Sequence, residues 1–242
     1  MTAPAPHLRQ WLQWLRRTPL HPQWLLGSKA RTKDWVGQHS RGRVLDIGCA
    51  DRWIEPHLPG GCDYIGLDYL ATGGLMYGAR PDIFADASRL PLRDASIDTV
   101  LMLEVLEHLR HPAQALSEIT RVLRPGGQLL LTMPFLYPVH DAPHDYQRYT
   151  CHGLAREMEA AGLIADSPTA NLGSIQTAGL LLNLALGGTA SRAIADKHVS
   201  AVLLPLIVVA IPAVNLTCWL LGKFLPNWPA LTAGYCVKAT RP

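Results

Sequence analysis

Short apolar runs alternate with amphipathic segments from Arg43 onward, and this alternation predicts a mostly parallel α/β sheet. Polar or turn-forming residues bound each run, as is typical of strands. We predict six strands, at residues 44–47, 64–67, 83–85, 99–103, 128–133 and 235–239.

Two segments between these runs carry apolar residues at helical spacing. In residues 112–123 the apolar positions recur every three or four residues, and the Pro-Gly-Gly at 125–127 predicts the helix end and the start of the next strand. The second segment, residues 151–161, ends at Gly162, and Thr150 in front of it suits an N-cap.

The last quarter of the chain departs from this alternation. Residues 199–222 form a run of 24 residues without a charge, which is long enough to cross a bilayer. Pro205, Pro212 and Asn215 interrupt it, and a weaker apolar run at 179–187 precedes it. Because the final predicted strand must rejoin the sheet, we expect the two runs to form a hairpin or a kinked wedge in a membrane. A pair of core or dimer-interface helices is the alternative.

The N-terminal region is basic and rich in tryptophan. Residues 1–43 carry eight Lys and Arg against one acid, whereas the whole chain has a net charge of only +3. An apolar stripe at helical spacing runs through the same region: Leu8, Trp11, Leu12 and Leu15. Tryptophan and cations on an amphipathic helix suit a membrane interface with anionic lipid. A helix packed on the domain is the alternative. The sequence has no recognition module for nucleic acid, so we expect no nucleic-acid partner.

The composition narrows the class of protein. With 242 residues, 48% hydrophobic and 17% charged, the chain has enough apolar surface for a full-sized core, which excludes a disordered protein. Its five cysteines are scattered without a Cys-x-x-Cys pair, which excludes a zinc ribbon and argues against a disulfide framework. No secretory signal is visible, so we expect a cytoplasmic protein.

The strongest chemical signal follows the first predicted strand. There Asp46 precedes Gly48, at which the backbone can approach a ligand closely. The second strand ends in Asp68, which suits the two ribose hydroxyls of a nucleoside. A dinucleotide site needs G-x-G-x-x-G, and this loop has one glycine. Asp46 would repel a phosphate but suits a cation. The residues therefore point to S-adenosylmethionine, which carries a sulfonium and an ammonium group and no phosphate.

Residues from about 40 to 165 resemble the class I S-adenosylmethionine-dependent methyltransferases, specifically the type 11 group. The matching motifs occur in the family's order and spacing, at 44–49, 64–68, 86–92, 97–108 and 118–127. The resemblance implies a Rossmann-like methyltransferase sheet, mostly parallel, with a hydrophobic helical insert at about 174–229 before the last strand. Residues 1–35 are then a separate N-terminal segment, and residues 36–242 are the methyltransferase domain.

The resemblance also implies which residues bind the cofactor. They lie at or shortly after the ends of the first four strands. They are Asp46, Gly48, Cys49 and Ala50 at the methionine end, Asp68 and Tyr69 at the ribose, Asp86 and Ala87 at the adenine, and Glu104 at the methyl-transfer cleft. Where the family's motif has two further glycines, this chain has Ala50 and Arg52. That departure keeps open a non-catalytic descendant of the family.

A polar loop after the fifth strand, residues 134–150, is the predicted acceptor side. Methyl transfer needs a positioned nucleophile and removal of its proton, and histidine suits that task because its pKa lies near neutral pH. We predict His140 first and His144 second as the catalytic base. The substrate contacts expected are His108, Asp145, Tyr146 and Arg148. Holding the Asp145 carboxylate is the alternative role of Arg148.

A metal site is conceivable in the same loop, from His140, Asp141, His144 and Asp145. The His-x-x-x-His spacing binds zinc on a helix, however, and Pro143 disfavours a helix here. We therefore expect no metal.

The motifs, the basic N-terminus and the apolar insert together predict an S-adenosylmethionine-dependent methyltransferase at the cytoplasmic face of a membrane. Its acceptor would be a lipid-like or lipid-linked small molecule. Two alternatives stay open. One is a soluble small-molecule methyltransferase whose insert forms a homodimer interface or a lid, and the other is a non-catalytic, methyltransferase-like membrane factor.

Overall fold

The computed structural model describes residues 14–27 and 29–242 of the chain. Their contacts divide into two compact units. The sheet unit comprises residues 30–135, 139–171 and 234–242. The hairpin unit comprises residues 136–138, residues 172–233 and the described residues before Ala30.

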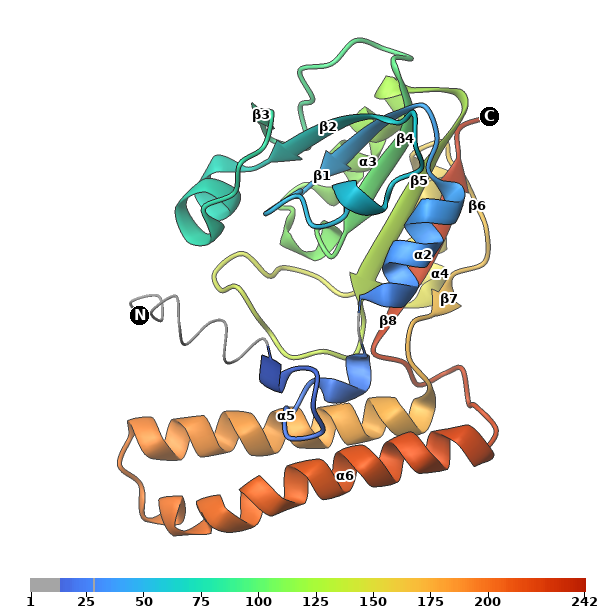
Figure 1. The fold of residues 1–242 in the computed structure, drawn as a ribbon. Helices are drawn as coiled ribbons and strands as arrows, with labels where there is room; N and C mark the ends of the chain where they lie inside the picture. The colour runs from blue at the N-terminus through green and yellow to red at the C-terminus, as the bar shows by residue number, and fades with distance from the viewer. Residues whose placement is uncertain (1–13, 28) are drawn as a thin grey trace. The chain divides into compact units, whose positions relative to one another are not determined.

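The sheet unit is built on an eight-stranded sheet with the path order β3-β2-β1-β4-β5-β8-β6 (Figure 1). Five strands run parallel: β1 (Arg43–Ile47), β2 (Asp63–Asp68), β3 (Ile83–Phe84), β4 (Ile97–Leu103) and β5 (Leu123–Pro134). The antiparallel strand β8 (Gly234–Thr240) lies between β5 and β6 (Ile164–Ala165) and also pairs with β7 (Thr169–Ala170). The predicted mostly parallel α/β architecture is thereby confirmed.

The ends of β5 correct the predicted strand at 128–133. This strand begins five residues earlier, at Leu123, because Leu123 pairs with Ile97 of β4. The pairing shifts register and continues at Gln128. The Pro-Gly-Gly at 125–127 therefore interrupts a strand rather than preceding one. The other predicted strands agree with the observed ends to within two residues.

Adjacent side chains of the central strands enter two different apolar cores, because successive residues of a strand point to opposite faces. Leu45 and Leu129 belong to the larger core, which α3 (Pro112–Val122) and α4 (Cys151–Ala160) cover. Their neighbours Val44 and Leu130 belong to the other core, which α2 (Ala30–His39) covers through the fully buried Val36. Helices thus shield both faces of the sheet.

The helix α2 was missed in the sequence. It crosses residue 35, where the predicted N-terminal segment ends, and residues 30–35 belong to the sheet unit. Basic residues surround its few apolar positions, so the pattern did not separate it from the segment before it. The predicted apolar stripe falls outside the described residues at Leu8, Trp11 and Leu12.

The hairpin unit consists mainly of two long helices, α5 (Ser174–Ala195) and α6 (Leu204–Phe224), joined through the short helix η5 (Val199–Leu203) (Figure 1). The two apolar runs thus form a helical hairpin, as the sequence predicts. Pro205 lies in the first turn of α6, where the N–H that proline lacks has no helical partner, and Pro212 lies inside the helix. The short helix η1 (Trp24–Leu26) packs beside the hairpin, where Leu25 and Leu180 share a small core.

The helix α5 and the stretch Val199–Phe224 are each long and apolar enough to cross a membrane, judged by length and composition. The hairpin is inserted between two strands that pair with each other, because Ala170 of β7 and Tyr235 of β8 are register partners. The chain therefore leaves the sheet and returns to it at one place.

Candidate active site

The carboxyl ends of β1, β2 and β4 meet at one edge of the sheet. Leu67 of β2 and Met102 of β4 both pair with Ile47, the last residue of β1. Asp68 directly follows Leu67, and Glu104 lies two residues after Met102. Both acids therefore lie at the same edge. Open α/β sheets bind their ligands there. The fold brings the predicted cofactor residues together in this region.

The loop after β1 adopts a backbone conformation that favours glycine, even at two positions where the chain has another residue. Gly48 has φ of +78°, and a Cβ at this residue would lie 2.4 Å from Cγ2 of Val105. Ala50 and Arg52 also have positive φ, at 47° and 59°. A residue with a Cβ is strained there by about 1–2 kcal/mol. The loop thus keeps a left-handed conformation at both positions where the sequence departs from the family's motif.

The side chain of Arg52 is bound to acids around this loop. Its guanidinium forms ion pairs with Glu55 at 2.8 Å and with Asp82 at 3.0 Å, and it lies 4.8 Å from the centroid of the Tyr64 ring. Asp82 also accepts the N–H of Gly66 in β2. Arg52 therefore ties the loop to the neighbouring strand, and these contacts offset part of its backbone strain.

Asp68 ends β2 and faces the same loop. One of its carboxylate oxygens accepts the N–H of Ala50 and the other accepts the N–H of Tyr69, each at 2.8 Å. A carboxylate has about four acceptor positions, so each oxygen keeps one for a further donor such as a ribose hydroxyl. Tyr69 is exposed next to it. Both residues are suitably placed for the predicted ribose contact.

The predicted adenine residues follow β3, which pairs with β2 at Asp68. Ala87 is buried, whereas Asp86 is exposed and accepts hydrogen bonds from the N–H and the hydroxyl of Ser88. Glu104, after β4, is exposed and has φ of 58°. These residues flank Asp68 along the sheet edge.

Asp46 and Cys49 are buried. The Tyr64 hydroxyl donates to the Asp46 carboxylate at 2.7 Å, and burial raises the pKa of Asp46 to about 7. Burial, with the charge of Asp46 nearby, raises the pKa of the Cys49 thiol to about 12. Gly66 leaves room for this thiol, because a Cβ there would lie 3.1 Å from its Sγ. Direct contact of these two side chains with the cofactor stays a prediction.

The charges at this edge fit S-adenosylmethionine better than a cofactor with phosphates. Asp68 and Glu104 are acids at the strand ends, and the cation of the loop, Arg52, is paired with Glu55 and Asp82. An acidic edge attracts a ligand with sulfonium and ammonium groups and disfavours a pyrophosphate.

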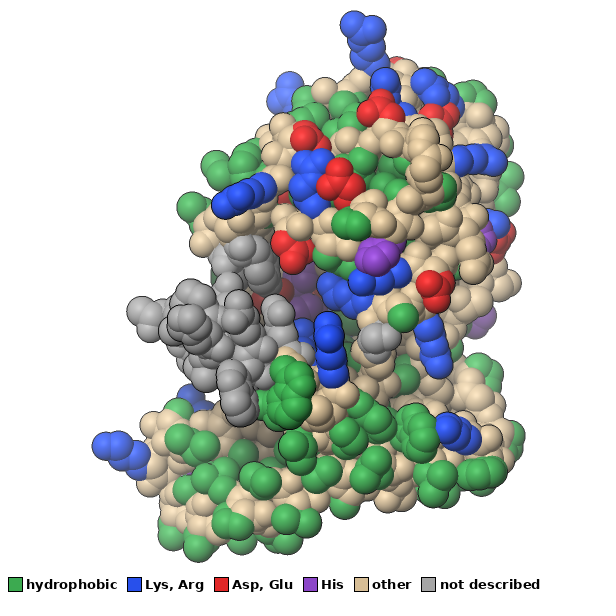
Figure 2. Space-filling model, viewed as in Figure 1, with side chains coloured by type: hydrophobic (Ala, Val, Ile, Leu, Met, Phe, Trp, Pro, Cys, Tyr) green, Lys and Arg blue, Asp and Glu red, His purple; other side chains and the backbone are tan. Residues whose placement is uncertain are grey.

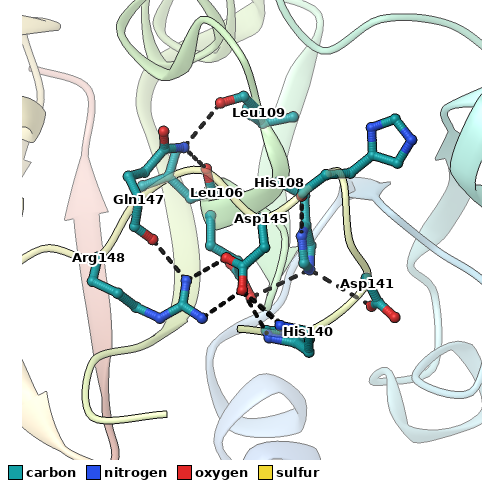
Figure 3. A network of polar contacts seen from close by, with 10 residues as sticks. Leu106, His108, Leu109, His140, Asp141, Asp145, Gln147 and Arg148 are labelled. Carbon is teal, nitrogen blue, oxygen red and sulfur yellow. Dashed lines mark hydrogen bonds and ion pairs between the residues drawn. The ribbon is translucent and has the colours of Figure 1, made fainter. Parts of the chain in front are cut away.

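A second polar group lies in η4 (Leu106–His108) and in the loop after β5 (Figure 3). The rings of His108 and His140 meet edge to face with centroids 4.9 Å apart. Their Nε2 atoms lie 3.6 Å and 3.9 Å from Oε1 of Glu107. Burial, followed by the charge of Glu104, raises the pKa of Glu107 to about 9. Burial also lowers the pKa of His108. Sequence reasoning placed Glu107 after Glu104 near the methyl-transfer cleft but gave it no role, although an acid among apolar residues directly after a buried strand was a usable signal.

Asp145 and Arg148 are paired with each other, and their contact with a substrate stays a prediction. Arg148 donates to the two Asp145 oxygens at 2.5 Å and 2.7 Å (Figure 3). This contact lowers the pKa of Asp145 to about 2. The Asp145 carboxylate also lies 3.2 Å from Nδ1 of His140, and its side chain is only 2% exposed. Arg148 therefore makes the contact expected of its alternative role, the contact with the Asp145 carboxylate.

The ring of His144 contacts Tyr146 rather than the other two histidines. The His144 and Tyr146 centroids are 6.5 Å apart, while the backbone carbonyl of His144 accepts a hydrogen bond from Nδ1 of His108 at 2.6 Å. Tyr146 is exposed, and its hydroxyl accepts a hydrogen bond from Arg110 at 3.0 Å. The cluster thus contains one of the two predicted bases, His140. Thr150 caps α4 as predicted.

Comparison with known proteins agrees with this fold and site. The family model described as "Methyltransferase domain" matches residues 45–131. A demethylmenaquinone methyltransferase of Renibacterium salmoninarum is 38% identical over 104 residues, which are 40% of this chain and 44% of that protein. A protein of Mycolicibacterium smegmatis named "Probable S-adenosylmethionine-dependent methyltransferase" is 33% identical over 177 residues, 63% of this chain and 65% of that one. The chain thus spans less than two thirds of the length of either relative.

The fold similarity reaches further along the chain. The crystal structure of an S-adenosylmethionine-dependent methyltransferase from Archaeoglobus fulgidus superposes with a TM-score of 0.54 and 16% identity, covering 95% of this chain and 99% of that one. The sheet and its edge therefore define a Rossmann-like domain. Residues 45–131 match the methyltransferase domain of the type 11 group, and this part of the chain is similar to proteins named as S-adenosylmethionine-dependent methyltransferases.

Proposed function

We propose that the protein transfers the methyl group of S-adenosylmethionine to a lipid-like or lipid-linked acceptor at the cytoplasmic face of a membrane. S-adenosylmethionine supplies an activated methyl group on a sulfonium, so the chain itself has to position the acceptor and receive its proton. His140 stays the predicted proton acceptor. Its Nδ1 lies 3.2 Å from Oδ2 of Asp145, a carboxylate that orients the imidazole ring.

The main support for membrane association is the distribution of polar residues in the hairpin, which lie between its helices rather than on its outer surface. Small and polar residues lie where α5 and α6 meet. A Cβ at Gly179 would lie 2.6 Å from Sγ of Cys218, and the fully buried amides of Asn183 and Asn215 are hydrogen-bonded at 2.8 Å. Close approach at small residues and hydrogen bonds between polar side chains are typical of helices packed in a bilayer.

The outer surface of the hairpin is correspondingly apolar. Of the most apolar stretch in Val199–Phe224, only 11% is buried. Large apolar side chains are exposed along α6: Leu206, Val208, Val209, Leu216, Leu220 and Phe224. Hydrophobic side chains gather over α5 and α6 in Figure 2, with few charges among them. An exposed apolar surface of this extent favours contact with lipid or with another protein.

The two ends of the hairpin carry polar groups, as expected at the two boundaries of a hydrocarbon layer. At one end, the Lys223 ammonium lies 3.4 Å from the centroid of the Trp219 ring, which also packs against Trp24 at 6.2 Å. Tryptophan and lysine favour the headgroup region. At the other end Arg192 and Asp196 form an ion pair at 2.6 Å. The 21 residues of α6 extend about 31 Å, close to the hydrocarbon thickness of about 30 Å.

Connectivity and charge favour one side of the membrane for the sheet unit. Since the hairpin starts and ends at the paired strands β7 and β8, it brings the chain back to the side it left. The excess of Lys and Arg in residues 1–43 favours the cytoplasmic side. The name of the R. salmoninarum relative, a demethylmenaquinone methyltransferase, supports a lipid-like acceptor class.

The test is methyl transfer to membrane lipids. The full-length protein in mild detergent is incubated with methyl-labelled S-adenosylmethionine and a total membrane lipid extract, and the label in the organic phase is counted. We expect labelled lipid with the native protein and none with Asp68→Ala. In cell fractions at physiological salt, we expect the protein in the membrane pellet.

Two results would contradict the proposal. A protein that stays in the high-speed supernatant as a detergent-free dimer, and labels only water-soluble acceptors, would favour the soluble alternative. A folded protein that does not bind S-adenosylhomocysteine in calorimetric titration would favour the non-catalytic membrane factor.

A further inference from the structure

Glu107 is a buried carboxyl group with no hydrogen bond to its side chain from the described part of the chain. The residue is 0% exposed, and neither Oε1 nor Oε2 has a hydrogen-bond donor. A carboxylate buried in this way is unfavourable unless a cation or a donor compensates it. The groups that face Oε1 therefore decide what Glu107 can bind.

Two imidazole nitrogens face this carboxyl group. Nε2 of His108 lies 3.6 Å from Oε1, and Nε2 of His140 lies 3.9 Å from it. The possible ligand atoms of the three residues all lie within 4.8 Å of one another. These separations are too long for hydrogen bonds. The two distances to Oε1 match neighbouring ligands of one ion, which are about 3–4 Å apart when each metal–ligand bond is about 2.1 Å.

The other nitrogen of each imidazole is already oriented by an acceptor. Nδ1 of His108 lies 2.6 Å from the backbone carbonyl of His144, and Nδ1 of His140 lies 3.2 Å from Oδ2 of Asp145, which Arg148 holds (Figure 3). The carbonyl of His144 can only accept, so Nδ1 of His108 donates and its Nε2 presents a lone pair, while the Asp145 carboxylate orients the ring of His140. Metal-binding histidines are oriented by such partners.

We propose that Glu107, His108 and His140 bind a divalent transition-metal ion. The Asp141 carboxylate lies next to this group, with its Oδ2 3.9 Å from Nε2 of His108. Imidazole nitrogens combined with carboxylates favour ions such as Zn²⁺, Mn²⁺ or Fe²⁺ over Ca²⁺ and Mg²⁺, which prefer oxygen ligands.

This proposal reverses the expectation of no metal and changes the residues considered for it. His144 and Asp145, which belong to the His-x-x-x-His loop set, do not join the ligand group and instead orient the ligands. The loop needs no helix, because the third ligand comes from Glu107 after β4. His140 then acts as a ligand rather than as a proton acceptor.

The site lies directly after β4, a few residues beyond Glu104 and the predicted methyl-transfer cleft. Three protein ligands leave a coordination position open for water or an acceptor hydroxyl, whose pKa a bound ion lowers. This consequence for catalysis rests on the proposed function. Binding of the ion does not, so the two can fail separately.

Metal titration of the full-length protein tests the proposal. After chelator treatment and removal of the chelator, the protein in mild detergent is titrated calorimetrically with ZnCl₂ and with MnCl₂. We expect one ion per chain with at least one of them. We expect Glu107→Gln and His140→Asn each to weaken binding by at least 100-fold, and Asp145→Asn by about 10–100-fold because it orients His140. Cobalt absorption spectra should lose their nitrogen-ligand bands in His140→Asn.

The matched control is His144→Gln, which removes a neighbouring imidazole that is not a ligand and should leave the affinity unchanged. Binding of S-adenosylhomocysteine reports folding for every variant, and His140→Asn keeps the test available if Glu107→Gln does not fold. Absence of ion binding by the folded native protein would overturn the proposal. So would equal losses in His144→Gln and His140→Asn. Ion binding without any methyl transfer would leave it standing while removing the proposed function.

Discussion

Asn215 of α6 joins three segments of the hairpin unit through one side-chain amide. Its carbonyl oxygen accepts a hydrogen bond from Asn183 of α5 at 2.8 Å, and its amide nitrogen donates to the backbone carbonyls of Pro19 and His21 at 2.6 Å and 3.0 Å. The side chain therefore holds both helices and the segment before η1 together in an otherwise apolar unit.

Substitution of these two asparagines should have unequal effects. Asn215→Ala removes three hydrogen bonds and should lower the free energy of unfolding by about 2–3 kcal/mol, since each bond contributes about 1 kcal/mol. Asn183→Ala removes the shared bond and should cost about 1 kcal/mol. Denaturant unfolding in detergent measures both, and equal losses would contradict this role of Asn215.

Charges on the outer face of α6 should release the protein from membranes. Val209 and Leu216 are both exposed in the middle part of α6, and a lysine near the bilayer centre costs about 2.5–3.5 kcal/mol. The double variant Val209→Lys, Leu216→Lys should therefore move from the membrane pellet to the supernatant. Ile164→Lys places one such charge at an exposed apolar site on β6 and should stay in the pellet. Identical fractionation of the two variants would argue against lipid contact.

Two acids at opposite ends of β2, Asp68 and Asp63, allow a role in cofactor binding to be distinguished from a structural role. Asp68→Ala should weaken binding of S-adenosylhomocysteine by at least about 10-fold, because a hydrogen bond to a charged group contributes about 1.5–3 kcal/mol. Asp63, at the other end of the strand, is exposed and paired with Arg43 at 2.7 Å. Asp63→Ala should leave the affinity unchanged in calorimetry. A comparable loss in Asp63→Ala would assign both effects to the strand instead.

Asp46 should make the protein less stable as the pH rises. Its pKa is raised to about 7 by burial, so between about pH 4 and pH 7 the folded chain keeps a proton that the unfolded chain has released. The contribution of Asp46 to the free energy of unfolding should fall across this interval by up to about 1.4 kcal/mol per pH unit and level off above it. Asp46→Asn should remove this contribution and leave the one from Glu107, whose raised pKa extends its effect to about pH 9, and denaturant titrations at several pH values would reveal the difference.

Asp82, whose pKa is lowered rather than raised, provides a variant that checks this interpretation. The Gly66 N–H and the Arg52 guanidinium lower the pKa of Asp82, so its contribution is present above the unfolded pKa and is lost as the pH falls. Asp82→Asn should therefore change stability at neutral pH and leave the decrease between pH 4 and pH 7 in place. If Asp46→Asn also left that decrease at its full size, another group would be its source.

The sequence predicted the elements whose signals are local. Thr150 and the helical spacing after it located α4, and short apolar runs located the strands. The start of β5 was missed because it depends on the pairing of Leu123 with Ile97, which lies far away in the chain. The helix α2 was missed for a similar reason, since Val36 becomes a core residue only through contacts with the sheet.

The sequence likewise predicted only those parts of the candidate site that depend on local signals. Asp68 could be placed because a strand end fixes its position, and motif spacing identified it. The approach of Glu107 to His140 could not, because residues 33 positions apart in the chain meet only when η4 and the loop after β5 are both in place. The pairing of Arg148 with Asp145 was predicted as an alternative, and only the geometry of the loop shows that it forms.

The buried thiol of Cys49, in the loop after β1, affects how this protein can be chemically labelled. Cys49 is 1% exposed, and its pKa of about 12 keeps it protonated at neutral pH. Alkylating reagents and mild oxidants act on the thiolate, so they should spare this residue. Fluorescent or spin labels can therefore be attached at more accessible cysteines without damaging the loop, and oxidative stress in a cell should leave this sulfur intact.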